Sequence, residues 1–416
     1  IDNAKAAGFN YIQLAVGNDG MRLLLDDMSL TVGDKTYSSD AVKTAVHNGN
    51  VTYDNEKSYI TNVDELTQSQ MNEISAYAQS KKMGVIPCVN TPGHMDAILA
   101  AASSLTGTNC SYSGSVRTID VTNATATAFT KAFLQKYITY FSNMGCKYFN
   151  MGADEYANDI FTGGSMGFGN LQYSGKYSYY VDYVNQVAGL IKNAGMKPMA
   201  FNDGIYFQSK TSYGTFDTDI IVCYWSNGWP GYTPMPASTL ASKGFKLINT
   251  NGDYYWVLGA NKCTAETAKD FSYEVFAKQG SNETLNSSLG SMFCIWADNP
   301  GELTEAQVIE NSAATIAAFG NACPQVEDVT ETAVTPPNPD NSELIITAPE
   351  GANELKVGSS VTLNAGKTAT WSVSQEGVVA LSSADDTVTQ AANTSVNAQK
   401  VKMEAVAAGK TTITAT

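Results

Sequence analysis

The chain has 416 residues, of which 43% are hydrophobic, so it is long enough to form two or three domains with a large buried core. It carries 25 lysines and arginines against 40 aspartates and glutamates, and this balance argues against nucleic acid or an anionic membrane as a partner. No apolar run reaches the roughly 18 residues that a membrane span needs, so we expect no span. With only two histidines and no Cys-X-X-Cys pair, we also expect no metal and no cofactor.

A recurring pattern organises the first three quarters of the chain. A helix-like segment ends in glycine, a short apolar strand follows, and Asn, Asp or Glu comes next. The glycines stand where helices commonly end in a left-handed residue, and they are Gly8, Gly84, Gly145, Gly195 and Gly244. The pattern predicts helices over 2–7, 67–82, 126–144 and 177–194, the second opening with a capping box at Thr67 and Gln70. It predicts strands near 11–16, 85–89, 147–151, 197–201, 219–224, 245–249 and 291–295.

Strands that alternate with helices indicate a parallel sheet. Seven strands are one short of the eight in a closed barrel, and the helix at 2–7 is of the kind that follows a first strand. We therefore predict a (β/α)8 TIM barrel over residues 1–325, with its first strand missing from the chain. The alternative is an open, doubly wound parallel sheet, whose strand ends also carry polar residues.

The composition changes near residue 325. Residues 326–342 are acidic and polar and include three prolines, which predicts a linker. Residues 343–416 show no helical period but carry short alternating runs near 344–346, 360–363, 370–373, 401–406 and 411–414. These runs predict a small all-β sandwich with Trp371 in its core. The segments VGSSVTLNA, ATWSVS and GKTTITA resemble a bacterial immunoglobulin-like domain of the group-2 type, which implies a spacer or anchoring module without chemistry.

The stretch YFNMGADEYAND, residues 148–159, places Asp154 and Glu155 directly after a predicted strand and a glycine turn. The same dipeptide occurs at Asp64 and Glu65, ahead of a predicted helix, where acids are favoured on electrostatic grounds. The strand before the first pair, and not the dipeptide itself, therefore indicates a catalytic site.

The ends of the predicted strands carry acids, amides and aromatic residues, and in a barrel these ends meet at one mouth. The candidates are Asn18, Asp19, residues 90–94, Asp154, Glu155, Asn202, Asp203, Trp225, Asp253, Tyr254, Tyr255, Trp296 and Asp298. This set suits a sugar, because apolar ring faces stack on aromatic side chains while hydroxyls bond to carboxylates and amides. The set has no cationic cluster or glycine-rich loop that would hold a phosphate.

Cleavage of a glycoside needs a proton donor and a group that stabilises the anomeric carbon, and retaining enzymes often use two carboxylates about 5–5.5 Å apart. Asp154 and Glu155 are neighbours on one strand, so they cannot easily flank one bond from opposite sides. Either another acid at a strand end is the nucleophile, or the substrate supplies its own. The eligible acids are Asp19, Asp203, Asp253 and Asp298.

Ordered motifs over about residues 1–320 resemble glycoside hydrolase family 20, the β-N-acetylhexosaminidases. They are MGADE, NTPGHMDAIL, AVGNDGMRLLLDDM, DEYAND, AFNDG, YWSNGW, NTNGDYYWVLG and IWAD, and they are similar to a bacterial surface exo-β-N-acetylglucosaminidase subgroup. The resemblance implies a barrel that releases terminal β-linked N-acetylhexosamine from a glycan. It also implies retention of configuration, with an oxazolinium intermediate formed by the substrate's own acetamido group.

The resemblance implies specific roles. Glu155 would be the general acid and base, Asp154 would accept the acetamide N–H, and Tyr255 would donate its hydroxyl to the acetamide oxygen, with Tyr254 nearly equal as a candidate. Trp225 and Trp296 would wall the sugar. The other predicted substrate-binding residues are His94 with Asp19 behind Glu155, Asn202 and Asp203 on the floor, and Asp298 at the outer hydroxyls.

The family's sugar-gripping arginine comes from the first strand and has no counterpart here, so we expect weak or no activity from the chain as it stands. Two alternative functions stay open. One is a lacto-N-biosidase of the same family, which releases a disaccharide. The other is a carbohydrate-binding or adhesin module on an inactive barrel. The resemblance further implies an extracellular or cell-surface location in a bacterium.

Overall fold

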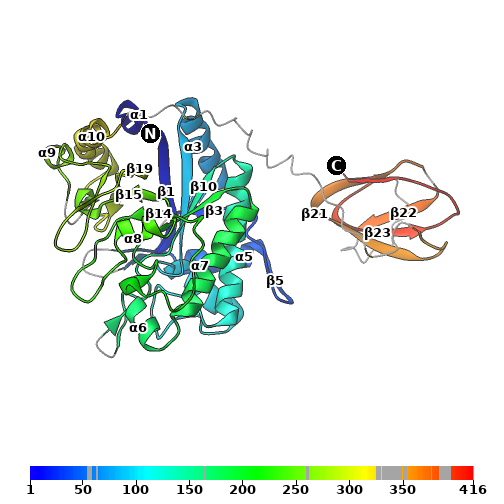
Figure 1. Ribbon diagram of the computed structural model, residues 1–416. Coiled ribbons are helices and arrows are strands. Elements are labelled where there is room, and N and C mark those ends of the chain that lie inside the picture. The colour runs from blue at the N-terminus through cyan, green and yellow to red at the C-terminus, as the bar shows by residue number, and fades with distance from the viewer. Residues whose placement is uncertain are drawn as a thin grey trace. The chain divides into compact units, whose positions relative to one another are not determined.

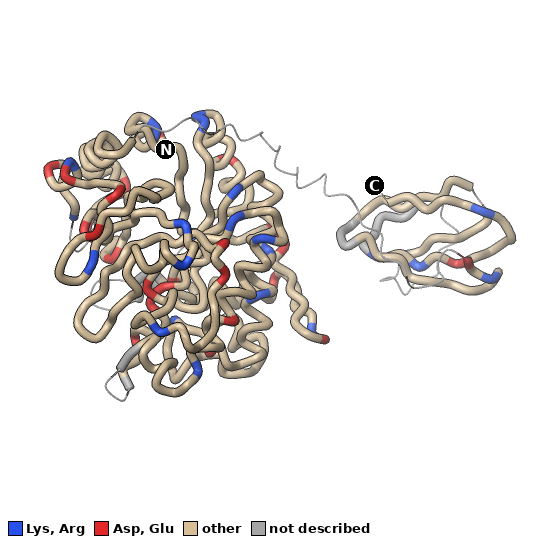
Figure 2. The backbone as a smooth tube through the Cα atoms, in the orientation of Figure 1, with Lys and Arg blue, Asp and Glu red and all other residues tan. Residues whose placement is uncertain are grey.

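The computed structural model describes residues 1–53, 59–61, 64–162, 165–258, 262–324, 329, 349, 354–375, 377–383 and 395–415. The chain forms two compact units, Ile1–Pro336 and Pro337–Thr416, which we describe separately. Their boundary falls within the span 326–342 that the sequence predicts as a linker. Figure 2 shows acidic residues interspersed among the lysines and arginines of the first unit. Among the described residues, no helix combines the length and the apolar character that crossing a membrane would need.

The first unit is built on a parallel sheet whose strands follow one another in chain order (Figure 1). These strands are β1 (Tyr11–Asn18), β9 (Gly84–Thr91), β10 (Tyr148–Gly152), β13 (Lys197–Phe201), β14 (Ile221–Tyr224), β15 (Leu247–Asn249) and β19 (Ser288–Ser291). Each pairs in parallel with the next. A doubly wound sheet reverses its strand order at a switch point, and this sheet does not. The winding is that of a TIM barrel, so the doubly wound alternative is wrong.

The sheet is a curved, open ladder among the described residues. Its last strand on one edge is β19, and on the other edge the short β2 (Gly20–Met21) folds back antiparallel on the end of β1. The seven parallel strands match the number predicted for a TIM barrel without its first strand, and β2 is the addition that the sequence did not predict.

The predicted helices are found with their ends within two residues. The α-helices are α1 (Asp2–Ala6), α2 (Ser39–Asn48), α3 (Gln68–Ser80), α4 (Asp96–Thr106), α5 (Ala124–Asn143), α6 (Phe168–Tyr173), α7 (Tyr177–Asn193), α8 (Ala237–Ser242), α9 (Ala265–Ala268) and α10 (Glu305–Asn321). The predicted capping box closes the start of α3. Gly8, Gly145, Gly195 and Gly244 are left-handed as predicted. The prediction that Gly84 is left-handed was wrong, because Gly84 is the first residue of β9 and Lys82 takes the left-handed conformation, with φ 55°.

Short strands decorate the connections between these elements. They pair as β3 (Leu23–Leu24) with β8 (Leu66–Thr67), β4 (Leu30–Val32) with β5 (Lys35–Tyr37), β6 (Val51–Tyr53) with β7 (Tyr59–Thr61), β11 (Phe161–Thr162) with β12 (Ser165–Met166), β16 (Trp256–Leu258) with β20 (Ile295–Ala297), and β17 (Val275–Phe276) with β18 (Glu283–Thr284). Single-turn 3-10 helices lie at Phe207–Ser209 and Gly252–Tyr254.

The predicted seventh strand, 291–295, is corrected by the structure. Only its first residue belongs to β19, which pairs with β15, and only its last belongs to β20, which pairs with β16. The residues between them pass from one ladder to the other, since Met292 N–H still donates to Asn249 at 2.9 Å while the Cys294 carbonyl accepts from Trp256 N–H at 3.0 Å. The apolar run in the sequence therefore marks a crossing point between two short pairings.

Aromatic packing fixes the helices that hold the site. Phe129, Phe133, Tyr137 and Phe141 recur every four residues on α5 and are fully buried. Each such ring stabilises the fold by about 1.5–3 kcal/mol. The neighbouring α7 also buries a row of tyrosines, and one of them, Tyr180, donates its hydroxyl to the carbonyl just beyond β10, at 2.5 Å. The packing of α7 thereby reaches into the loop that carries the acid pair.

The second unit forms one antiparallel sheet, in the order β22 (Val379–Ser383), β23 (Ser395–Ala405), β21 (Ser360–Val373), β24 (Ile413–Ala415). Trp371 is fully buried in its core, as predicted. The runs 360–363 and 370–373, predicted as two strands, are one strand with an irregular register between Asn364 and Ala369. The described residues give one sheet instead of the predicted two-sheet sandwich, and 344–346 lies outside them. The immunoglobulin-like assignment stays a prediction.

Candidate active site

The acid pair lies beyond the carboxyl end of β10, on a loop with an unusual backbone. Gly152 has φ 71°, and a Cβ added there would meet Asn90 Oδ1 at 2.0 Å, so only glycine fits. Beyond it, Ala153, Glu155 and Ala157 are also left-handed, with φ of 64°, 45° and 49°. Each left-handed non-glycine residue costs about 1–2 kcal/mol. The loop is thus held in a shape that its own sequence does not favour.

Three side chains from three other segments hold this backbone. Asn90 Oδ1 accepts the N–H of Ala153 at 3.2 Å, and an Asp203 oxygen accepts the N–H of Glu155 at 2.8 Å. The hydroxyl of Thr118 accepts the N–H of Ala157 at 3.0 Å. Every left-handed residue of the loop beyond Gly152 therefore has its N–H bound by a side chain that is distant in sequence.

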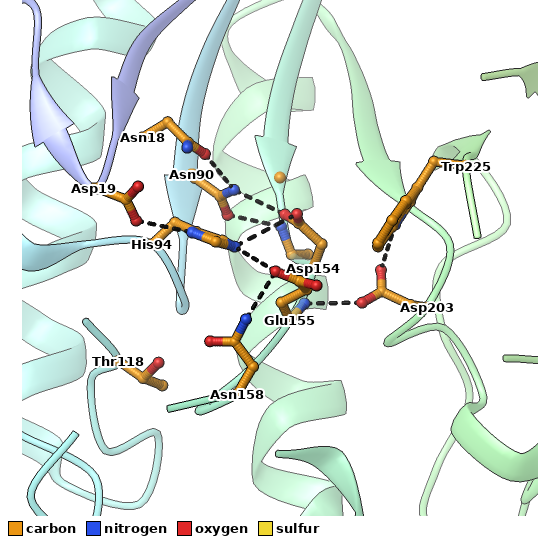
Figure 3. A network of polar contacts seen from close by, with 12 residues as sticks. Asn18, Asp19, Asn90, His94, Thr118, Asp154, Glu155, Asn158, Asp203 and Trp225 are labelled. Carbon is orange, nitrogen blue, oxygen red and sulfur yellow. Dashed lines mark hydrogen bonds and ion pairs between the residues drawn. The ribbon is translucent and has the colours of Figure 1, made fainter. Parts of the chain in front are cut away.

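Asp154 is almost enclosed. Asn90 Nδ2 donates to its Oδ1 at 2.7 Å and also to Asn18 at 3.0 Å, and His94 Nε2 lies 3.7 Å from its Oδ2 (Figure 3). Burial raises the pKa of Asp154, and the adjacent Glu155 adds to this effect, while the charge of His94 and the Asn90 bond oppose it. Asp154 thus has one oxygen held by an amide and the other close to the histidine.

Glu155 lies at the end of a chain of charged groups. Its Oε2 is 3.3 Å from His94 Nε2, and His94 Nδ1 is 2.8 Å from Asp19 Oδ1 (Figure 3). Burial alone would lower the pKa of His94, but the carboxylates of Asp19, Glu155 and Asp154 outweigh it and hold that pKa well above its ordinary value. A charged imidazole donates from both nitrogens, so it can bind Asp19 and the acid pair at once.

Asp203 is fully buried at the end of β13 and accepts three hydrogen bonds. Besides the N–H of Glu155, it accepts the indole N–H of Trp225 at 3.0 Å and the hydroxyl of Tyr232 at 2.5 Å. Burial and the charge of Asp154 raise the pKa of Asp203 to about 7, against the effect of its three donors. Its neighbour Asn202 binds the backbone of Trp225 at 2.8 Å. These two residues place the acid and the aromatic wall relative to one another.

Trp225, Tyr255 and Trp296 form the aromatic side of the site. The rings of Trp225 and Tyr255 are nearly parallel, at 13°, with centroids 6.5 Å apart, and Trp296 lies 6.3 Å from Tyr255. Burial raises the pKa of Tyr255 well above its ordinary value, and Cys294 and Asp154 add to this effect. Tyr254 points elsewhere: it packs on Phe271 and donates to a carbonyl at 3.4 Å.

Asp298 lies just beyond β20 and is partly buried. Burial and the charges of Asp19 and Glu155 raise its pKa, so it lies within electrostatic reach of the same network. Two of the predicted candidates do not join this group: Tyr254, which was nearly equal to Tyr255 on the sequence alone, and Asp253, which is exposed on the 3-10 turn Gly252–Tyr254. No group of three or more His, Cys, Asp or Glu side chains that could hold a metal ion is found in the part of the chain that the structure describes.

Three residues of the site were missed by the sequence analysis: Asn158, Tyr232 and Thr118. Asn158 Nδ2 donates to Glu155 Oε2 at 2.8 Å. Its spacing of three residues from Glu155 within one turn was an available signal. Tyr232 and Thr118 offered none, because each reaches the site from a loop whose path depends on the tertiary fold.

A buried acid behind the site should make stability depend on pH. Asp96, in the first turn of α4, is 5% exposed, and neither carboxylate oxygen has a hydrogen-bond partner among the described residues. Burial and the charge of Asp19 raise its pKa to about 7, against the charges of Arg117 and His94. A raised pKa favours the protonated acid in the folded state. The stability that it contributes is therefore complete below the ordinary value of 3.8 and is lost as pH rises through about 7.

We expect the free energy of unfolding to fall between about pH 4 and pH 7, with Asp96 contributing at most about 1.4 kcal/mol per pH unit. Asp96→Asn should flatten this dependence in denaturant titrations across the range. Asp40 is an exposed acid in the first turn of α2, so Asp40→Asn is the matched control and should follow the wild type. An unchanged pH dependence in Asp96→Asn would show that the burial of this acid does not matter.

Comparison with known proteins identifies the family to which the chain belongs. Residues 20–305 match the profile of the glycosyl hydrolase family 20 catalytic domain. Structures of the pneumococcal virulence factor StrH, an exo-β-D-N-acetylglucosaminidase with tandem family-20 catalytic modules, are 36% and 37% identical to the chain. The alignments cover 77% of the chain and 79% and 78% of theirs, with TM-scores of 0.69 and 0.70.

A lacto-N-biosidase from Bifidobacterium bifidum is 25% identical over 253 residues, which are 58% of this chain and 22% of that enzyme. The chain thus matches about a fifth of the length of this curated relative. The family resemblance seen in the motifs is confirmed by the profile match and by the StrH structures. The chain belongs to glycosyl hydrolase family 20, a family of glycosidases.

Proposed function

We propose that the protein is a retaining exo-β-N-acetylhexosaminidase that removes terminal β-linked N-acetylhexosamine from glycans, with the substrate's acetamido group as the nucleophile. The observation that carries this proposal is the arrangement of the acid pair. Both carboxylates reach the same nitrogen of His94, at 3.7 Å from Asp154 and 3.3 Å from Glu155. They therefore lie side by side and cannot act on opposite faces of one bond.

The other acids at the strand ends suit the role of nucleophile poorly. Asp203 is fully buried and accepts three hydrogen bonds, and Asp19 is paired with His94 at 2.8 Å. Asp253 is exposed on a 3-10 turn, and Asp298 lies beyond Trp296 on β20. An acetamido oxygen carried by the sugar needs none of them, and it uses the two acids where they stand.

The proposed reaction has two steps. Glu155 gives its proton to the glycosidic oxygen while the acetamide oxygen attacks the anomeric carbon, so the C–O bond breaks and an oxazolinium ion forms. Asp154 accepts the acetamide N–H and stabilises the positive charge, and Tyr255 donates to the acetamide oxygen. Water then attacks the anomeric carbon, Glu155 takes its proton, and the acetamide is released. Two inversions at the same carbon give retention.

A second candidate of the same family is a lacto-N-biosidase, which the 25% identity to the Bifidobacterium bifidum enzyme favours. The two differ in whether one sugar or two are released. A carbohydrate-binding or adhesin module is the candidate of another class, although Asp154 and Glu155 in contact with His94 support catalysis. We also propose an extracellular or cell-surface location, with the second unit as a spacer.

The protein is tested together with its natural flanking sequence. We expect hydrolysis of 4-nitrophenyl β-N-acetylglucosaminide with retention, and inhibition by a thiazoline that mimics the oxazolinium ion. Hydrolysis of the 4-nitrophenyl lacto-N-bioside alone would establish the biosidase instead. Binding of either sugar without hydrolysis would support the module without activity. An active enzyme that ignores the thiazoline would rule out the acetamide as the nucleophile.

A further inference from the structure

The two carboxyl oxygens of Glu155 have different surroundings. Oε2 is 2.8 Å from Asn158 Nδ2 and 3.3 Å from His94 Nε2. Oε1 has no hydrogen-bond partner in the described part of the chain, and Figure 3 shows it on the side of the carboxyl group away from both donors. An oxygen that accepts an amide N–H and lies beside a charged imidazole is a poor place for a proton, because the proton would face both groups.

Asn158 is held in place before any substrate binds. Its backbone N–H donates to the Glu155 carbonyl at 3.2 Å, which closes a turn and returns its side chain to the Glu155 carboxyl group. Its two neighbours are tied to one loop: Ala157 to Thr118 at 3.0 Å, and Asp159 to the Ser115 hydroxyl at 2.7 Å. The amide is therefore fixed from both sides and does not depend on a ligand for its position.

Among the described residues, the side-chain amide of Asn158 hydrogen-bonds to Glu155 alone. Its Oδ1 is buried without a hydrogen-bond partner among the described residues, and its Nδ2 donates to Glu155 Oε2 at 2.8 Å. A buried amide oxygen left without a partner is unfavourable, so the cost of placing an amide here must be offset by what its N–H₂ group does. His94, by contrast, is shared between Asp19, Asp154 and Glu155. Asn158 therefore makes the shorter of the two contacts to Oε2, and it is the donor that is not shared with another carboxylate.

We propose that Asn158 is a positioning residue that directs the acid proton of Glu155 to Oε1. This inference rests on the proposed function. The Oε1–H then donates to the glycosidic oxygen, whose bond to the anomeric carbon breaks, and the electron pair stays with the leaving oxygen as it takes the proton. In the second step Oε1 takes a proton from the attacking water. Asn158 exchanges no proton and acts only by occupying Oε2.

The test compares leaving groups, because protonation matters only where the leaving oxygen needs it. With phenyl β-N-acetylglucosaminide the departing oxygen is basic and requires the acid, whereas 2,4-dinitrophenolate leaves without it. We expect Asn158→Ala to lower kcat/KM for the phenyl substrate by roughly tenfold or more, and for the dinitrophenyl substrate by less than about threefold. Asn158→Asp has the same shape but cannot donate when ionised, so it should show the same selective loss.

Asn193→Ala is the matched control, because it makes the same change at an exposed amide at the end of α7. We expect its kcat/KM to stay within about threefold of the wild type for both substrates. Equal losses for both substrates in Asn158→Ala and Asn158→Asp would show that the amide is structural and overturn the inference. Wild-type activity on the phenyl substrate retained by Asn158→Asp would also overturn it. A wild-type protein that is tested with its natural flanking sequence and hydrolyses neither substrate would reject the proposed function itself, which is a different result.

Discussion

Glu155→Gln should lower kcat/KM for phenyl β-N-acetylglucosaminide by about 10²–10⁴-fold, the usual contribution of a general acid. Glutamine keeps the size of the side chain and can still meet His94 and Asn158, but it has no acid proton to give. The loss should shrink for a 2,4-dinitrophenyl substrate, whose leaving group needs no protonation. Steady-state kinetics on purified protein, with circular dichroism to confirm folding, measures both effects.

The chain provides its own control in the second Asp-Glu pair. Glu65 binds His47 at 2.9 Å and Asn50 at 2.8 Å, ahead of α3 and away from the acid pair. Glu65→Gln makes the same chemical change in the same dipeptide, and we expect its kcat/KM to stay within about threefold of the wild type, as for most substitutions distant from the chemistry. If the two variants lose activity alike, the assignment of Glu155 as the acid is wrong.

Asp154→Asn should lower kcat/KM by about 10²–10³-fold, similar to the loss of one preorganised group that stabilises a transition state. The wild-type carboxylate can accept the acetamide N–H. An asparagine whose oxygen accepts from Asn90 would point its N–H₂ group at the acetamide N–H, and the opposite orientation would lose the bond from Asn90. In neither orientation would it offset the positive charge of the oxazolinium ion. Because the acetamide must be oriented in every turnover, the loss should be similar for phenyl and dinitrophenyl leaving groups. This independence distinguishes Asp154 from Glu155.

Binding of the thiazoline gives a second measurement for the same variant. The inhibitor resembles the cyclised intermediate, so its affinity should fall together with kcat/KM in Asp154→Asn, by isothermal titration calorimetry. Asp64→Asn, in the exposed copy of the dipeptide, should bind the thiazoline as the wild type does. Tight binding of the thiazoline by an inactive Asp154→Asn would assign Asp154 a role outside the stabilisation of the intermediate.

The elements that local sequence determines were predicted well. Helix ends were found through left-handed glycines and the capping box of Thr67, and most strands through apolar runs followed by polar residues. These signals depend on neighbours in the sequence. The run 291–295 misled for the same reason, since its hydrophobicity reports burial but not which of two ladders a residue joins.

The sequence predicted most of the residues that lie at the strand ends, but not the contacts between their side chains. Asp154 and Glu155 stood out because a strand and a glycine precede them. The choice between Tyr254 and Tyr255 needed the fold, which packs Tyr254 against Phe271 and Tyr255 between Trp225 and Trp296. Tyr232 could not be found from the sequence, because its bond to the buried acid of β13 spans 29 residues between two loops.

The three side chains that accept backbone N–H groups of the loop after β10 limit how the site could be grafted onto another protein. A peptide with the sequence of residues 152–159 has no reason to adopt three left-handed non-glycine residues when it is placed on another barrel. The loop would need partners equivalent to Asn90, Thr118 and Asp203, which come from three different connections. Transplanting only the acidic segment would therefore transfer its sequence without its backbone conformation. The smallest unit that can be grafted is the whole mouth of the barrel.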